Sequence, residues 1–210
     1  MFTMVSTLHS TSTVVLKRVL SQPEVTSYLD LLRHHHKESY SHSMRVGFLS
    51  IDLGLDERLA DEDLLLLGSA GLLHDIGKTK IPTTILAKRG QLDAQERTLM
   101  DEHPVHGFNL LEALPDPRIR QIVIAHHEYK PSPYPREGVE RRDSARDVMD
   151  RRRSDSMITS LAQLVAVADL YDALASRRSY KPALPKPQIE QLLRTQFKGD
   201  QRYVDAVLLR

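Results

Sequence analysis

Residues 74–78 bring together side chains that could bind metal ions and a phosphate: His74-Asp75-Ile76-Gly77-Lys78. Successive residues on a helix point about 100° apart, so an adjacent His-Asp pair suits two neighbouring metal ions better than one tetrahedral site. The imidazole would bind one ion, and the carboxylate would bridge both. Gly77 would let the chain turn sharply, and Lys78 would offer a cation to a phosphate. A lone His-Asp pair is more often part of an ordinary surface, so this interpretation depends on the rest of the chain.

Other histidines and carboxylates occur where helices are expected. Glu38 and His42 are four residues apart and therefore share a helix face. Asp169 lies inside an apolar helical pattern, which is unusual for a carboxylate. Each residue taken alone could be a core histidine, a helix end or an exposed charge. Together with residues 74–75 they make eight candidate ligands, and the core of a helical bundle is a natural place for such a site: Glu38, His42, His74, Asp75, His103, His126, His127 and Asp169.

The histidine tract at residues 34–36 is a different case. His34-His35-His36 stands beside the predicted site helix, and we interpret it as exposed helix surface. We therefore leave it out of the candidate metal ligands.

Composition limits the chemistry and the partners. The 210 residues include ten histidines and no cysteine, which excludes disulfides, thiolate metal sites and cysteine nucleophiles. Histidine and carboxylate ligands favour zinc, iron or manganese. A net charge of +1 gives no general attraction to nucleic acid or membrane. We find no signal peptide and no segment of about 20 apolar residues that could span a membrane, and we expect a cytoplasmic protein.

Hydrophobic periodicity predicts an all-α fold. The apolar residues recur at helical spacing, and no stretch alternates with the period of a strand. Asp93 with Glu96 resembles a capping box that opens a helix. We expect a short N-terminal extension at residues 1–23 and one domain at residues 24–210. Helices are expected from Pro23, at 39–53, at about 57–73, from 93 to 100, up to 126–127, at 158–175, at 188–197 and at 203–209.

Residues 130–155 interrupt this pattern. Residues 130–135 read Lys-Pro-Ser-Pro-Tyr-Pro, which cannot form regular helix or central strand. Residues 136–155 follow as a charged insertion or loop, dominated by arginine and acidic residues. We favour a solvated loop or an exposed helix here. The alternative is a lid that contacts substrate, because arginine suits phosphate.

An ordered set of motifs runs through residues 37–183. Its segments are 38–46, 74–78, Ile81-Pro82 with Ile85-Leu86, 102–104, 126–128, Tyr134-Pro135, 167–174 and 178–181. This set resembles the HD superfamily of metal-dependent phosphohydrolases, and specifically its HD-GYP branch. The resemblance implies an HD-domain helical bundle with a metal centre in its core. It further implies two or three divalent transition-metal ions, iron or manganese, with Glu38 as the extra ligand of a third ion.

The resemblance also implies an activity: hydrolysis of a cyclic dinucleotide, cyclic di-GMP above all, by a metal-bridged hydroxide. Asp75 would be catalytic by bridging the ions, and Lys78 would stabilise developing charge and contact substrate. Further substrate contacts implied by the resemblance are Arg178, Tyr180 and Lys181, and of these Arg178 and Lys181 would hold the second phosphate or a guanine. The family uses its version of the 130–155 loop to contact signalling proteins, so a signalling protein partner is expected there.

The chain departs from the family pattern in that loop. The family's Gly-Tyr-Pro signature reads Pro133-Tyr134-Pro135 in this chain, and the Asp-Gly that usually precedes it is missing. The arginine-rich insertion is also longer than the link that usually leads into the helix of Asp169. Proline at 133 cannot adopt the positive φ that glycine allows. Two alternatives therefore remain beside the cyclic di-GMP phosphodiesterase. One is a phosphohydrolase of another nucleotide or phosphate ester, and the other is an inactive module that senses cyclic di-GMP or binds a protein.

Overall fold

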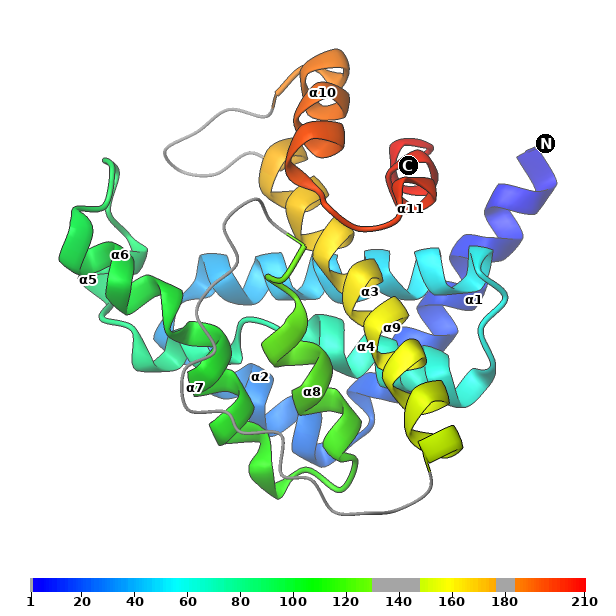
Figure 1. Cartoon of the computed structure of the whole chain (residues 1–210), viewed down its shortest axis with the longest axis horizontal. Coiled ribbons are helices and arrows are strands. Elements are labelled where there is room, and N and C mark those ends of the chain that lie inside the picture. The colour runs from blue at the N-terminus through cyan, green and yellow to red at the C-terminus, as the bar shows by residue number, and fades with distance from the viewer. Residues whose placement is uncertain (1, 130–147, 177–183) are drawn as a thin grey trace.

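The computed structural model describes residues 2–129, 148–176 and 184–210, with side chains described for 11–129, 156–176 and 184–210. All regular elements in these ranges are helices, which confirms the predicted all-α fold (Figure 1). In chain order they are α1 Phe2–Leu20, α2 Pro23–His35, α3 Lys37–Asp56, α4 Asp61–Leu73, η1 Ile76–Lys80, α5 Thr83–Leu86, α6 Ala94–Asp101, α7 His103–Leu110, η2 Leu111–Ala113, α8 Pro117–Ala125, α9 Val148–Ala175, α10 Lys186–Gln196 and α11 Gln201–Leu208.

The pair α3 and α4 forms the centre of the bundle. The leucine-rich segment of α4 is buried along its whole length from Leu66 to Leu73, as expected for a helix that is apolar on all sides. The two helices approach closely because glycines face each other: a Cβ on Gly71 would lie 3.0 Å from the Cα of Gly47. This close contact brings the middle of α3 beside the end of α4, where the His-Asp pair follows.

Several helix boundaries differ from the sequence prediction, and the largest difference is in α9, which begins at Val148 rather than at residue 158. The helix expected from residue 57 begins only at Asp61, because Arg58 adopts a left-handed backbone with φ of 55° that ends the preceding helix. The expected N-terminal extension is helical from Phe2 to Leu20 and packs against α3 and α4. Its Val15 and Val19 are buried, so these turns contribute to the core. By contrast, the capping box of Asp93 and Glu96 is present at the start of α6.

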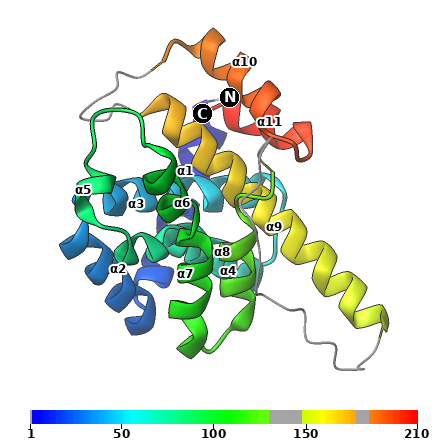
Figure 2. The same cartoon turned by 60° about the vertical axis from the view of Figure 1, so that its left-hand side comes forward.

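Helix α9 crosses the bundle and packs against α3, α8, α10 and α11 (Figure 1 and Figure 2).

The sequence prediction of no membrane-length apolar segment was wrong, because Ser156–Ala175 is long and apolar enough to cross a membrane. However, 61% of the 18-residue window that meets the criterion is buried inside the protein, and the core helix of a soluble protein meets the same criterion. The first turns of α9, residues 148–155, lie within the expected charged insertion, whereas residues 130–147 lie outside the described ranges.

Candidate metal centre

Seven of the eight predicted ligands are buried together in the middle of the bundle: His42, His74, Asp75, His103, His126, His127 and Asp169. They come from the second turn of α3, the end of α4, the junction of α6 and α7, the end of α8, and α9. The centroids of neighbouring imidazole rings lie between 4.0 and 5.6 Å apart. Buried polar side chains are costly unless they have partners, so such a cluster requires a specific explanation.

Three of the histidines stand where a helix ends, and each directs Nδ1 at a carbonyl three residues earlier. The contacts are His74 to Gly71 at 2.8 Å, His103 to Met100 at 2.7 Å, and His126 to Val123 at 2.5 Å. A carbonyl oxygen can only accept a hydrogen bond, so each Nδ1 carries the proton. The lone pair is therefore on Nε2, as it is in many metal-binding histidines.

The carboxylate of Asp75 lies between the histidines with its two oxygens facing different partners. Oδ1 is 3.3 Å from Nε2 of His103, whereas Oδ2 is 3.4 Å from Nε2 of His74 and 3.7 Å from Nε2 of His42. Lys78 also contacts Oδ2, at 2.5 Å. One oxygen faces each half of the cluster, which is the geometry that a bridging carboxylate requires.

The cluster divides into sets of ligand atoms that could each surround one ion. Within each set the three ligand atoms lie within 4.8 Å of one another: His42-His74-Asp75, His103-His126-His127 and His74-His126-Asp169. Nε2 of His103 and Nε2 of His127 are only 3.2 Å apart. Two nitrogens bound at right angles about 2.1 Å from one ion would be about 3.0 Å apart, so this spacing suits two ligands of one ion.

His42 connects this cluster to a second carboxylate on α9. Its Nε2 lies 3.0 Å from Oδ1 of Asp169, and its Nδ1 lies 2.7 Å from Oδ2 of Asp172. Burial alone would lower the pKa of His42, but the contacts with Asp169 and Asp172 outweigh it and raise that pKa. In the structure His42 therefore bridges two carboxylates of one helix.

Asp172 is itself held by several hydrogen bonds. Arg45 donates to it in a bidentate manner, from Nε at 2.6 Å and Nη2 at 2.9 Å, and Ser176 donates from Oγ at 2.7 Å. Burial would raise the pKa of Asp172, but the hydrogen bonds from His42 and Arg45 lower it well below its usual range. The ionised carboxylate is thus an acceptor that orients the ring of His42. Although Asp172 stands within a recognised motif, sequence reasoning assigned it no role, and its position three residues after Asp169 on the same helix was the available signal.

The pKa values of His126, His103 and Asp75 are shifted in the directions that suit metal ligands. Burial lowers the pKa of His126 far below its usual value, and the nearby His74 and His103 lower it further. Burial also lowers the pKa of His103, although the nearby Asp75 raises it in part. For Asp75, burial would raise the pKa, yet Lys78 and His74 hold it well below the usual range. His103 and His126 are therefore expected to be neutral and Asp75 ionised at neutral pH, whereas the contacts with Asp169 and Asp172 favour the protonated form of His42.

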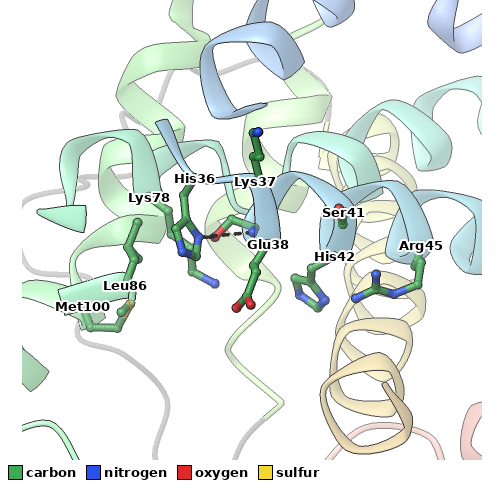
Figure 3. A pocket seen from close by; sticks show the side chains of 10 residues that line it. His36, Lys37, Glu38, Ser41, His42, Arg45, Lys78, Leu86 and Met100 are labelled. Carbon is green, nitrogen blue, oxygen red and sulfur yellow. Dashed lines mark hydrogen bonds between the residues drawn. The ribbon is translucent and has the colours of Figure 1, made fainter. Parts of the chain in front are cut away.

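A pocket of about 280 Å³ opens beside the cluster along one side of α3 (Figure 3). Glu38, His42 and Arg45 line it from α3, and Lys78 lines it from η1. Glu38 is exposed and is the only predicted ligand outside the buried cluster, although in Figure 3 its carboxylate points to the same side of α3 as His42. The pocket gives a molecule in solution access to His42 and Lys78.

Two observations add to the expectations for residues near the pocket. Gly77 lies in the short helix η1 and allows close contact there, since a Cβ would lie 1.9 Å from the carbonyl oxygen of His103. The tract at residues 34–36 is not simply exposed surface. Nδ1 of His36 accepts from the backbone N–H of Ser39 and so caps α3, while Nε2 of His35 contacts the carbonyl of Ile81 at 2.8 Å.

The remaining predictions lie outside the described residues. These are the substrate contacts Arg178, Tyr180 and Lys181, the altered Pro133-Tyr134-Pro135 signature, and the proposed partner-binding part of the loop at 130–147. They stay predictions from the sequence.

Comparison with known proteins gives matches over most of the chain. It is 34% identical over 169 residues to a cyclic di-GMP phosphodiesterase of Thermotoga maritima, covering 78% of this chain and 41% of that protein. It is 29% identical over 194 residues to 3'3'-cGAMP-specific phosphodiesterase 2 of Vibrio cholerae, covering 90% of this chain and 34% of that protein. The chain thus spans between a third and about two fifths of these relatives' lengths.

Solved structures show the same fold. The HD domain of the Listeria monocytogenes phosphodiesterase PgpH superposes with a TM-score of 0.54 at 17% identity, covering 90% of this chain and 88% of that one. The structure of that domain in complex with cyclic-di-AMP superposes with a TM-score of 0.52 at 18% identity, covering 87% of this chain and 83% of that one. The HD domain family itself matches residues 39–174, which include every buried residue of the cluster described above. The chain belongs to the HD domain family.

Proposed function

We propose that this protein is a metal-dependent phosphodiesterase that hydrolyses a cyclic dinucleotide, with cyclic di-GMP as its substrate. The observation that carries the proposal is the buried cluster in which imidazole Nε2 atoms surround the two oxygens of Asp75. Relatives named for cyclic di-GMP and for 3'3'-cGAMP support the substrate class. The second relative makes 3'3'-cGAMP the alternative substrate to test.

The residues present fit a centre of at least two divalent ions, with iron or manganese as the first candidates. Nitrogen and carboxylate ligands without sulfur suit these metals. Asp75 would bridge, His42 and His74 would bind on one side, and His103, His126 and His127 would bind on the other. Asp169 would complete the site, and Glu38 would serve a third ion from the pocket side. Ions bound there supply positive charge and make water nucleophilic at neutral pH.

The protein side chains supply binding and orientation. Lys78 lies beside Asp75 and lines the pocket with 19% of its side chain exposed, so its charge can reach a phosphate that enters there. The carbonyls that accept from Nδ1 of His74, His103 and His126 hold each ring in place before any ligand binds. Preorganised groups of this kind stabilise charge without reorganisation during the reaction.

Metal content and substrate turnover test the proposal together. Protein produced with iron and manganese available should contain at least two transition-metal ions per chain by elemental analysis. The metal-loaded protein should hydrolyse cyclic di-GMP or 3'3'-cGAMP far faster than bis(p-nitrophenyl) phosphate, and removal of the metals by a chelator should stop the reaction. Fewer than two ions per chain after reconstitution would contradict the metal centre. Turnover of simple esters alone would favour the other-phosphate-ester alternative.

Asp172→Asn provides a separate test of the metal centre. Asparagine keeps the size of the side chain but removes the charge that orients His42 and holds Arg45. Loss of a carboxylate behind a metal-binding histidine lowers metal affinity by about 10- to 100-fold, and we expect a loss of that size in competition with a chelator.

The matched control for Asp172→Asn is Asp52→Asn. Asp52 is also a buried carboxylate on a core helix, hydrogen-bonded to Ser12 and ion-paired with Arg210. The Asp52→Asn variant should be less stable than the unmodified protein but should bind metal with the same affinity. Equal metal affinity in Asp172→Asn and the unmodified protein would mean that Asp172 does not act through His42.

A further inference from the structure

Arg45 lies beside the candidate metal centre, and its ion pair with Asp172 is the only role it has been given so far. It follows Glu38 and His42 at helical spacing on α3, and all three line the same pocket. Its side chain is 46% exposed although it forms a bidentate ion pair with the buried Asp172. The guanidinium of Arg45 is thus fixed by Asp172 and also exposed to the pocket, so an anion in the pocket could bind to it.

The hydrogen-bonding capacity of Arg45 is only partly used. A guanidinium has five N–H groups in a fixed planar fork. Within the described part of the chain, Asp172 takes one from Nε and one from Nη2. The others can serve a ligand, and arginine matches the geometry of phosphate oxygens better than a point charge does.

Lys78 and Arg45 lie at different distances along the chain of contacts that leads to the metal centre, which matters for a substrate with two phosphates. Lys78 contacts Asp75 directly, whereas Arg45 reaches the cluster only through Asp172 and His42. In Figure 3 the two cations lie on opposite sides of Glu38 and His42. Lys78 is therefore placed for a phosphate at the metal centre, and Arg45 for a phosphate that is not at the centre.

We propose that Arg45 binds the second phosphate of the cyclic dinucleotide, the one that is not being hydrolysed, and thereby selects substrates with two phosphates. This inference rests on the proposed function. Its ion pair with Asp172 fixes the guanidinium in position before substrate arrives, which reduces the entropy lost on binding. Arg45 thus contributes to specificity, whereas the predicted ligands and Lys78 act on the phosphate that reacts.

Arg45→Gln tests the inference in the metal-loaded protein, with Arg194→Gln as the control. Arg194 is comparably exposed, at 41%, and is also paired with carboxylates, but it lies on α10. Loss of a charge-assisted hydrogen bond should weaken binding by about 10- to 100-fold. We expect this loss in calorimetric binding of a slowly hydrolysed phosphorothioate analogue of cyclic di-GMP and in KM for cyclic di-GMP. Asp172 keeps its contacts with His42 and Ser176 in this variant, so turnover of bis(p-nitrophenyl) phosphate per metal-loaded chain and helical content should change little. Metal content is measured alongside so that binding is compared at equal metal occupancy.

Each other outcome has a distinct meaning. Unchanged binding in Arg45→Gln, while the unmodified protein hydrolyses cyclic di-GMP, would overturn the inference and leave the proposed function intact. An equal loss with bis(p-nitrophenyl) phosphate would place Arg45 at the reacting phosphate instead. Loss of metal in step with binding would show that Arg45 acts only through Asp172 and His42. If the unmodified metal-loaded protein hydrolysed no cyclic dinucleotide, the proposed function and this inference would both fail.

Discussion

Replacing Asp75 with alanine is expected to abolish hydrolysis of the cyclic dinucleotide. The two oxygens of Asp75 face different histidines, so no other side chain of the cluster can take over both contacts. Removal of a single hydrogen-bond donor that stabilises a transition state costs about 100- to 1,000-fold in kcat, and loss of a shared charged ligand should cost at least the upper figure. Steady-state turnover and elemental analysis of the purified variant provide the measurement.

The variant should keep its helical spectrum, because the surrounding histidines remain hydrogen-bonded to their helix carbonyls. Asp30→Ala, which removes an exposed carboxylate from α2, is the control and should retain full activity. Near-normal turnover by Asp75→Ala would rule out a shared-metal mechanism. Loss of helical structure would instead show that Asp75 is needed for folding, and Asp75→Asn would then test its chemical role.

Replacing Gly77 with alanine is expected to destabilise the fold by about 3 kcal/mol or more, since the new methyl group cannot be accommodated. It would lie 1.9 Å from the carbonyl oxygen of His103 and 2.5 Å from the backbone nitrogen of Gly107. Both are backbone atoms, so no side-chain rotation can relieve the contact. Relief requires η1 and α7 to separate, which would also displace His103 from the cluster. Urea unfolding monitored by circular dichroism measures the change.

Gly90→Ala is the matched control for this prediction. A Cβ at Gly90 would have no neighbour within 4 Å, and its backbone does not require glycine. Alanine there should leave the free energy of unfolding unchanged or raise it by about 0.4–1 kcal/mol, because it restricts the unfolded chain. If Gly77→Ala unfolded at the same urea concentration as Gly90→Ala, the close contact between η1 and α7 would not be a constraint on this protein.

Local sequence patterns were a reliable guide to individual helices. The stripe of Val25, Leu29 and Leu32 predicts α2, and these side chains are buried. The capping box of Asp93 and Glu96 opens α6 as expected. Both features depend on residues within one or two turns of each other. The start of α4 was predicted too early, because the left-handed Arg58 breaks the helix where periodicity alone continues.

Contacts between distant segments were not predictable in the same way. Asp172 and His42 are 130 residues apart, and nothing in either neighbourhood indicates that they meet. Gly77 has no room for a side chain because backbone atoms of α7 lie against it. Val15 is buried because α1 packs against α3 and α4. These features follow from the crossing of helices, which depends on the summed packing of the whole core rather than on local propensity.

The sequence by itself determined the all-α class and the identities of the candidate ligands, because helical periodicity and the side-chain chemistry of histidine and aspartate can be recognised without coordinates. Only the tertiary structure decided which of those atoms face one another. It put the two oxygens of Asp75 between opposite histidines, left Glu38 exposed at the pocket and held Arg45 against Asp172. The physical reason is that a metal centre requires atoms to meet within a few ångströms, and in this chain only the packing of α3, α4, α7, α8 and α9 brings them that close.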